Sequence, residues 1–106
     1  MATASQQILA LEILELLAYE LEANTDLEVD YDGKMLSIEL NPNQTYLINF
    51  HEPTNQLWVS SPISGAHHFS FNDNQWLSTR DGTGLNALLT AELKYQLGYN
   101  LDLSHA

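Results

Sequence analysis

The apolar residues of this chain follow a helical period at both ends and a strand period in between. Setting each residue 100° from the last predicts a first helix with one apolar face, widened by Leu9 and Leu16. That face consists of Ala10, Ile13, Leu14, Leu17 and Leu21. From Leu27 onward, apolar positions recur at every second residue, which is typical of strands with one buried face. Helical spacing returns in a second stripe formed by Leu85, Leu88, Leu89 and Leu93.

Turn-forming residues divide the alternating stretch into short strands. Asp32-Gly33 is typical of a hairpin turn, and Asn41-Pro42-Asn43 and Asn72-Asp73-Asn74 favour two further turns. Ser5 and Thr83 are candidate helix caps, and Gly98 is expected to end the second helix. The expected elements are a helix over 5–23, strands over 27–31, 35–40, 45–51, 57–61, 68–71 and 75–78, and a helix over 85–97.

This order of elements predicts the fold class. Consecutive strands joined by short turns favour an antiparallel meander, and two amphipathic helices must cover one face of the sheet. The predicted fold is α+β, a two-layer α/β sandwich with two helices on one face of a five- to six-stranded antiparallel sheet. The chain has 106 residues and no linker, so residues 1–106 are expected to form a single domain. The other sheet face should stay at least partly open to solvent.

Acidic residues dominate the first third of the chain. The formal net charge is −11, the only Lys and Arg residues are Lys34, Arg80 and Lys94, and no base precedes Lys34. Carboxylates are hard ligands that suit Mg²⁺, Ca²⁺ or Fe²⁺, whereas a purely solubilising role is the simpler interpretation. We name seven of these carboxylates the acidic set, and if the first strand lies at a sheet edge we expect five of them, Glu12, Glu15, Glu22, Glu28 and Asp30, to merge into one acidic ridge that binds metal weakly. The acidic set is Glu12, Glu15, Glu20, Glu22, Asp26, Glu28 and Asp30.

The same composition excludes several classes of function. Affinity for nucleic acid or for an anionic membrane requires clustered Lys and Arg, which this chain lacks. The absence of cysteine removes disulfides, thiolate metal sites and cysteine nucleophiles. No catalytic nucleophile–base set is recognisable, and no residue is assigned a catalytic role. Without a basic or arginine-rich leader, a cytoplasmic protein is expected, with the mature form of a mitochondrial matrix protein as the alternative.

Trp58 is the most distinctive residue of the predicted sheet. Alternation places Leu57 and Val59 toward the helices and Trp58 toward solvent, where a framed Trp suits a protein–protein contact. The alternative is a Trp that neighbouring side chains half-bury. Among the histidines, His67 and His68 should point to opposite faces, and His51 beside Glu52 is a candidate for a secondary metal site.

Several segments together resemble the frataxin family, and in particular its bacterial CyaY type. The signature of the third and fourth strands is matched by Asn49, Pro53, Gln56-Leu57-Trp58 and Ser60-Ser61-Pro62-x-Ser64-Gly65. The rest of the resemblance lies in Asp26-Leu27-Glu28-Val29-Asp30, Gly33, Leu36-Ser37-Ile38, Trp76, Arg80-Asp81-Gly82, Leu85-x-x-Leu88-Leu89-x-x-Glu92-Leu93 and Leu101-Asp102-Leu103-Ser104.

The resemblance implies an iron-binding protein of iron–sulfur cluster assembly. It implies weak binding of Fe²⁺ and Fe³⁺ at the acidic set, and binding of cysteine desulfurase and its scaffold protein through Asn49, Gln56 and Trp58. It also implies a monomer that can oligomerise with iron. The chain departs from the family pattern at Phe50-His51, Asn55 and Ala66. The first two departures remove bases expected near the partner face, whereas Ala66 replaces a proline that often follows Ser-Gly in the family.

Two other functions remain open at this point. One is a ferroxidase, in which clustered carboxylates bind Fe²⁺ and O₂ oxidises it to Fe³⁺. The other is a binding module without any role for metal. Titration with Fe²⁺ in the absence of O₂ distinguishes these alternatives.

Overall fold

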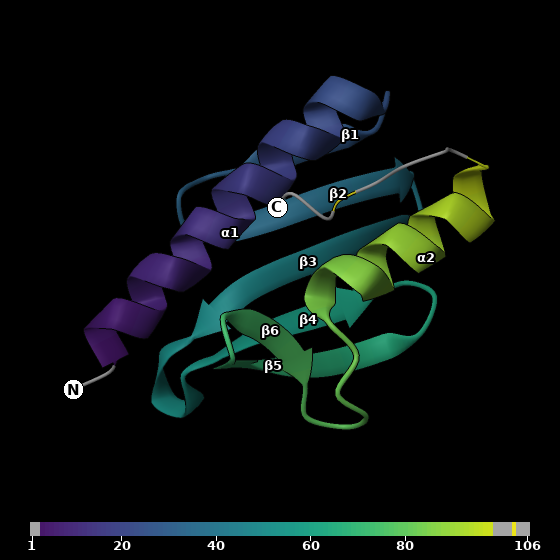
Figure 1. Ribbon diagram of the computed structural model, residues 1–106. Helices are drawn as coiled ribbons and strands as arrows, with labels where there is room; N and C mark the ends of the chain where they lie inside the picture. Colours follow the sequence, from purple (N-terminus) through teal and green to yellow (C-terminus); the bar gives the residue numbers. More distant parts are fainter. Residues whose placement is uncertain (1–2, 99–102, 104–106) are drawn as a thin grey trace.

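The computed structural model describes residues 3–98 and Leu103, and it has the predicted order of elements (Figure 1). Helix α1 spans Thr3–Asn24 and helix α2 spans Leu85–Leu97. Between them lie six strands and a short 3₁₀ turn, η1 (Glu52–Thr54). The strands are β1 (Glu28–Tyr31), β2 (Met35–Asn41), β3 (Gln44–His51), β4 (Gln56–Ser61), β5 (Gly65–Asn72) and β6 (Gln75–Ser78).

The six strands form one antiparallel sheet in the order β1-β2-β3-β4-β5-β6, which confirms the predicted meander. The tightest reversals use the residues expected of turns. Gly33, with φ of +94°, lets the chain turn from β1 into β2, and Asp73 and Asn74 adopt positive φ between β5 and β6. Because each strand pairs with the next one along the chain, β1 and β6 form the two edges of the sheet.

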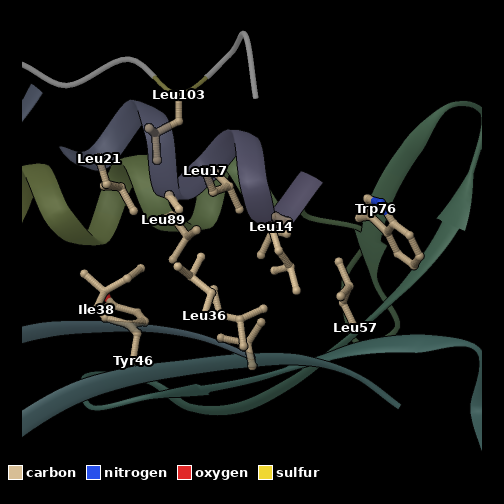
Figure 2. Close-up of a cluster of buried hydrophobic side chains, with 14 of the residues drawn as sticks. Leu14, Leu17, Leu21, Leu36, Ile38, Tyr46, Leu57, Trp76, Leu89 and Leu103 are labelled. Atoms are coloured by element: carbon tan, nitrogen blue, oxygen red, sulfur yellow. The ribbon is translucent and has the colours of Figure 1, made fainter. Parts of the chain in front are cut away.

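Both helices lie against the same face of the sheet, and the core fills the space between the two layers (Figures 1 and 2). The buried face of α1 contributes Leu14, Leu17 and Leu21. The fully buried side chains of the strands and α2 that meet them are Leu36, Ile38, Tyr46, Ile48, Leu57, Leu89 and Leu93. This arrangement confirms the predicted two-layer α+β sandwich and leaves the second sheet face, here called the open face, without a covering helix.

Several local predictions were wrong. Helix α1 begins at Thr3, so Ser5 lies inside the helix and is not its cap. Leu16 is 47% exposed, because the apolar face of α1 is narrower than its leucine content suggests. The residue before α2 is Gly84, and no side chain caps that helix, so Thr83 does not do so. Strand β5 runs over eight residues, since pairing with β4 extends it back to Gly65.

The end of α2 was predicted correctly. Gly98 has φ of +70° and donates its backbone N–H to the Lys94 carbonyl at 2.8 Å, which ends the helix in the left-handed conformation that Gly adopts most readily. Leu103 is completely buried, whereas Leu101 lies outside the described residues. Neither helix in the described part of the chain combines the length and apolar composition that a membrane span requires.

Candidate functional site

The acidic set surrounds the edge strand β1. Five of its members lie on α1 and on the connection that follows it, and Glu28 and Asp30 lie on β1. All are exposed except Glu20, which is half-buried and accepts a hydrogen bond from the Asn24 amide at 3.3 Å. Among the described residues, no carboxylate of this set is in an ion pair with a Lys or Arg side chain. Their negative charge is therefore left to solvent and to mobile cations.

Tyr31 joins α1 to β1 and brings part of the acidic set together. Its hydroxyl donates to the Leu11 carbonyl of α1 at 3.3 Å. Burial raises the pKa of Tyr31, and the negative charges of Glu15 and Asp32 raise it further. Glu15 of the helix is thus close enough to act electrostatically on a side chain of β1.

Alternation divides the acidic set between the two sides of β1. Val29 and Tyr31 are partly buried on the helix side, so Glu28 and Asp30 project from the open face. The carboxylates of α1 and those of β1 therefore lie on opposite sides of the β1 strand. Within the described residues, no three Asp, Glu or His side chains converge closely enough to hold one ion. The arrangement provides a negative field around a sheet edge rather than a single coordination cage.

Glu39 belongs beside this set, and sequence reasoning missed it. The register of the hairpin places Glu39 of β2 directly opposite Glu28, and two like charges in that position destabilise a strand pair. Asp26, Glu28 and Glu39 line a hollow of about 270 Å³ at this end of the edge. The signal was available, because a hairpin turn at Asp32-Gly33 fixes which residues of the two strands oppose each other.

Trp58 is half-buried on the open face, as the alternative interpretation had it, because two imidazole rings sandwich it. The ring centroid of His51 lies 3.6 Å from that of Trp58, and the centroid of His68 lies 4.4 Å away on the other side, both nearly parallel at 13°. The indole Nε1 donates to Gln56 at 3.1 Å. These contacts hold the indole in one orientation before any partner arrives.

The three predicted partner-binding residues are neighbours on this face. Asn49 pairs with Trp58 across β3 and β4, and Gln56 contacts the indole from the same strand. The His51 ring stacks on Trp58 and forms a 2.8 Å hydrogen bond with Thr54. Among the described residues, His51 belongs to no group of side chains that could hold a metal ion. His67 and His68 do point to opposite faces, since only His68 stacks on Trp58.

On the helix side of the sheet, the Glu92 carboxylate of α2 accepts hydrogen bonds from three hydroxyl groups. Its Oε1 accepts from Tyr46 at 2.5 Å and from Ser61 at 2.8 Å, and its Oε2 accepts from Ser64 at 2.5 Å. Ser61 also accepts the backbone N–H groups of Ile63 and Ser64, both at 3.0 Å, and so closes the turn between β4 and β5. Burial, together with the hydrogen bond and charge of Glu92, holds the pKa of Tyr46 above its ordinary value of 10.0.

A second chain of hydrogen bonds runs from this turn to Arg80. The Arg80 guanidinium lies 3.0 Å from His67 Nδ1, and His67 Nε2 lies 2.7 Å from the Ser64 hydroxyl. A guanidinium only donates, so Nδ1 must accept and Nε2 must carry the proton that is donated to Ser64. His67 therefore has no lone pair available to activate Ser64, and the arrangement joins the turn to α2 instead of forming a nucleophile–base pair. Sequence reasoning missed these roles for Tyr46 and Glu92, because only the packing of α2 brings the two residues together.

Comparison with known proteins agrees with this geometry. Residues 3–99 match the family model described as the Frataxin-like domain. The chain is 36% identical over 86 residues to mitochondrial frataxin of Dictyostelium discoideum, a match that covers 77% of this chain and 45% of that protein. It is 34% identical over 83 residues to the iron-sulfur cluster assembly protein CyaY of Photobacterium profundum, covering 78% of each. The chain thus spans less than half of the longer mitochondrial relative.

Solved structures share the fold. Frataxin from Psychromonas ingrahamii superposes with a TM-score of 0.88 over 98% of this chain and 99% of that one, at 23% identity. Trimeric frataxin from Saccharomyces cerevisiae, complexed with ferrous iron, superposes with a TM-score of 0.68 at 31% identity over 82% of this chain and 80% of that one. A family model that covers nearly the whole chain and relatives above 30% identity lead to one conclusion: this chain belongs to the frataxin family.

Proposed function

We propose that this protein serves iron–sulfur cluster assembly by gathering iron at the acidic set and by binding cysteine desulfurase and its scaffold protein through the open face. The observation that carries the proposal is the uncompensated negative charge around β1. Glu28 and Glu39 oppose each other across two strands, an arrangement that weakens the sheet and that a bound cation would relieve. The names of the relatives, an iron-sulfur cluster assembly protein and a frataxin complexed with ferrous iron, support the same role.

The proposed mode of iron binding is weak and involves several carboxylates. Exposed side chains that do not converge can each hold a hydrated Fe²⁺ through one or two oxygens, and the surrounding field raises the local concentration of the ion. Weak retention suits a protein that must release its cargo. Two acidic groups contribute, one on α1 with Glu15 and one on the edge with Glu28 and Glu39.

The proposed partner surface lies next to this edge. Asn49, Gln56 and Trp58 lie on the open face beside the exposed side chains of Met35 and Leu47, which are 39% and 40% exposed. The His51–Trp58–His68 stack keeps the indole ordered, which lowers the conformational entropy lost when a partner binds. The acidic set would in turn attract a basic patch of the desulfurase.

The experiment is a titration of isotopically labelled protein with Fe²⁺ under nitrogen, followed by amide NMR spectra. Amides of α1, β1 and the β1–β2 edge should broaden at substoichiometric iron, and a Glu28→Gln/Asp30→Asn double variant should lose the broadening at β1. Asp73→Asn is a matched control, because it removes one carboxylate at the opposite end of the sheet while keeping a residue type that tolerates positive φ. Equal broadening in both variants, or no broadening near β1, would contradict iron binding at this edge.

A second experiment tests binding to the desulfurase–scaffold complex and the two alternative functions. Trp58→Ala should weaken binding to a desulfurase–scaffold complex by about tenfold or more, as expected of an interface hot spot, whereas Leu77→Ala on β6 should not. Oxygen uptake above that of iron alone, lost in the double variant, would favour the ferroxidase alternative. A protein that shows no response to Fe²⁺ under nitrogen would be the binding module without a metal role.

A further inference from the structure

One cavity in the described part of the chain lies away from both the acidic set and the open face. It has a volume of about 740 Å³ and opens between α1, the β5–β6 turn and α2. This volume falls within the range of small-molecule sites, roughly 300–1,000 Å³. Its lining comes from Ile13 of α1, from Asn74 to Trp76 and from the outward side of α2 as far as Lys94.

The lining combines an apolar wall with one charge. Ile13, Trp76 and Ala87 form the wall, and the Trp76 indole packs against Phe71, whose ring lies 5.1 Å away and is tilted by 58°. Figure 2 shows Trp76 at one end of the core, so the wall of the cavity is also the edge of the rigid interior. Asn74, Gln75 and Thr90 add neutral polar groups.

The charge of the cavity is opposite to that of the molecule. The protein has a formal net charge of −11 and only three Lys or Arg residues, yet Lys94 lines this cavity and none of its described lining residues is Asp or Glu. Among the described residues, no carboxylate lies within ion-pair distance of the Lys94 ammonium group. The hollow beside Glu28 and Glu39 would repel an anion, whereas this cavity offers a cation beside an apolar surface.

We propose that this cavity binds a small amphipathic carboxylate, with its apolar body against Trp76, Ala87 and Ile13 and its carboxylate at Lys94. Ala87 and Lys94 both line the cavity and are seven residues apart on the same side of α2, which corresponds to about 10.5 Å at 1.5 Å per residue. An unbranched acid of about eight carbons spans most of that distance, at roughly 1.3 Å per bond. The site is independent of iron binding, because it shares no residue with the acidic set.

The test uses octanoate as the probe, with octanamide and octylammonium as ligands of the same apolar body and different charge. Trp58→Phe leaves Trp76 as the only indole, so its fluorescence reports on this cavity. The Trp76 fluorescence emission should change as octanoate is added and should then reach a plateau. Octanoate should also shift the amide NMR signals of Gln75, Leu85 and Thr90. Octanamide and octylammonium should bind about fivefold more weakly, the upper end of what one exposed charge pair contributes.

Matched variants complete the design. Lys94→Gln should weaken octanoate binding by about fivefold and leave octanamide binding unchanged, whereas Lys34→Gln in the β1–β2 hairpin should change neither. Ala91→Phe should fill the cavity and abolish binding of all three probes. No saturable response to octanoate at millimolar concentration, equal affinity for the three probes, or equal effects of Lys94→Gln and Lys34→Gln would each overturn the proposal. Lys94 and Lys34 both lie on the surface, and circular dichroism verifies that the variants fold.

Discussion

At the scale of single residues, Glu92 organises more of the structure than any other charged side chain described. Its two carboxylate oxygens accept three hydroxyl groups from three places in the sheet, and this explains why Ser61 and Ser64 occur in the sequence Ser-Ser-Pro-x-Ser-Gly. Hydrogen bonds to an ionised acceptor stabilise more than neutral ones, and removing the acceptor leaves its partners unsatisfied. Ser61 and Ser64 are therefore structural residues on the helix side of the sheet, opposite the proposed partner surface.

Glu92→Ala should lower the free energy of unfolding by about 2–3 kcal/mol, because Tyr46, Ser61 and Ser64 lose a charged acceptor in a partly buried site. Urea denaturation measures the change. Glu92→Gln keeps the shape and one acceptor oxygen, so it should cost about half as much. Glu12→Ala, an exposed position of α1, should stay within about 0.5 kcal/mol of the wild type. An effect of Glu92→Ala no larger than that of Glu12→Ala would disprove the role of this carboxylate.

His67 should make stability depend on pH on the acidic side of neutrality. Burial lowers the pKa of His67 below its ordinary value of 6.5, and the positive charge of Arg80 lowers it further. The unfolded chain therefore binds a proton more readily than the folded one, and the free energy of unfolding should fall as pH drops below about 6.5. The slope of urea stability against pH should be smaller in His67→Gln than in the wild type. An unchanged slope would show that His67 does not contribute.

At the scale of elements, the C-terminal end of α1 carries charge that opposes its own stability. A helix C-terminus has a partial negative charge, yet the last turns of α1 contain Glu20 and Glu22 and its last turn has no base. The β1–β2 hairpin at the sheet edge also carries charge that lowers its stability, because Glu28 lies opposite Glu39. Two adjacent elements thus place carboxylates where they cost stability, which is typical of a surface retained for binding.

Glu20→Gln and Glu22→Gln should each raise the free energy of unfolding by about 0.3–0.5 kcal/mol, because the repulsion from the helix dipole is removed at an exposed site. The gain should be smaller for Glu20, whose carboxylate also accepts from Asn24. Glu12→Gln, in the middle of α1, is the control and should show no gain. Thermal and urea unfolding of the three variants measure the difference. Destabilisation by both C-terminal substitutions would mean that these glutamates make stabilising contacts.

At the scale of the whole molecule, a sheet with one covered and one open face separates stability from recognition. The helices and the inward sheet face enclose the core (Figure 1), whereas the open face carries Trp58 and the acidic residues surround the β1 edge. Recognition residues can therefore change without disturbing the packing. The net charge of −11 acts over the entire surface and adds self-repulsion to the folded state.

Salt should stabilise this protein. Raising the ionic strength from about 0.01 M to about 0.15 M shortens the Debye length from about 30 Å to about 8 Å, which screens repulsion between the carboxylates. The Tm should rise by on the order of 5 °C, as a gain of about 1 kcal/mol implies for a chain of this size. A Glu22→Gln/Glu28→Gln/Asp30→Asn triple variant should respond less. Differential scanning calorimetry at the two ionic strengths measures the effect, and an equal Tm in both would contradict it.

The sequence by itself determined the elements and the two-layer architecture, because hydrophobic period and turn chemistry act over only a few residues. Those local rules predict which face of the sheet each side chain of Leu57, Trp58, His67 and His68 occupies. They also predict that α2 ends at Gly98. The pairing of Glu28 with Glu39 follows from the local hairpin turn, whereas only the tertiary structure decided that two histidines enclose Trp58 and that Glu92 meets Tyr46 and Ser64. Each of these contacts depends on strand register or on the seating of α2 against the sheet, and both are set by the packing of the whole core rather than by any local segment.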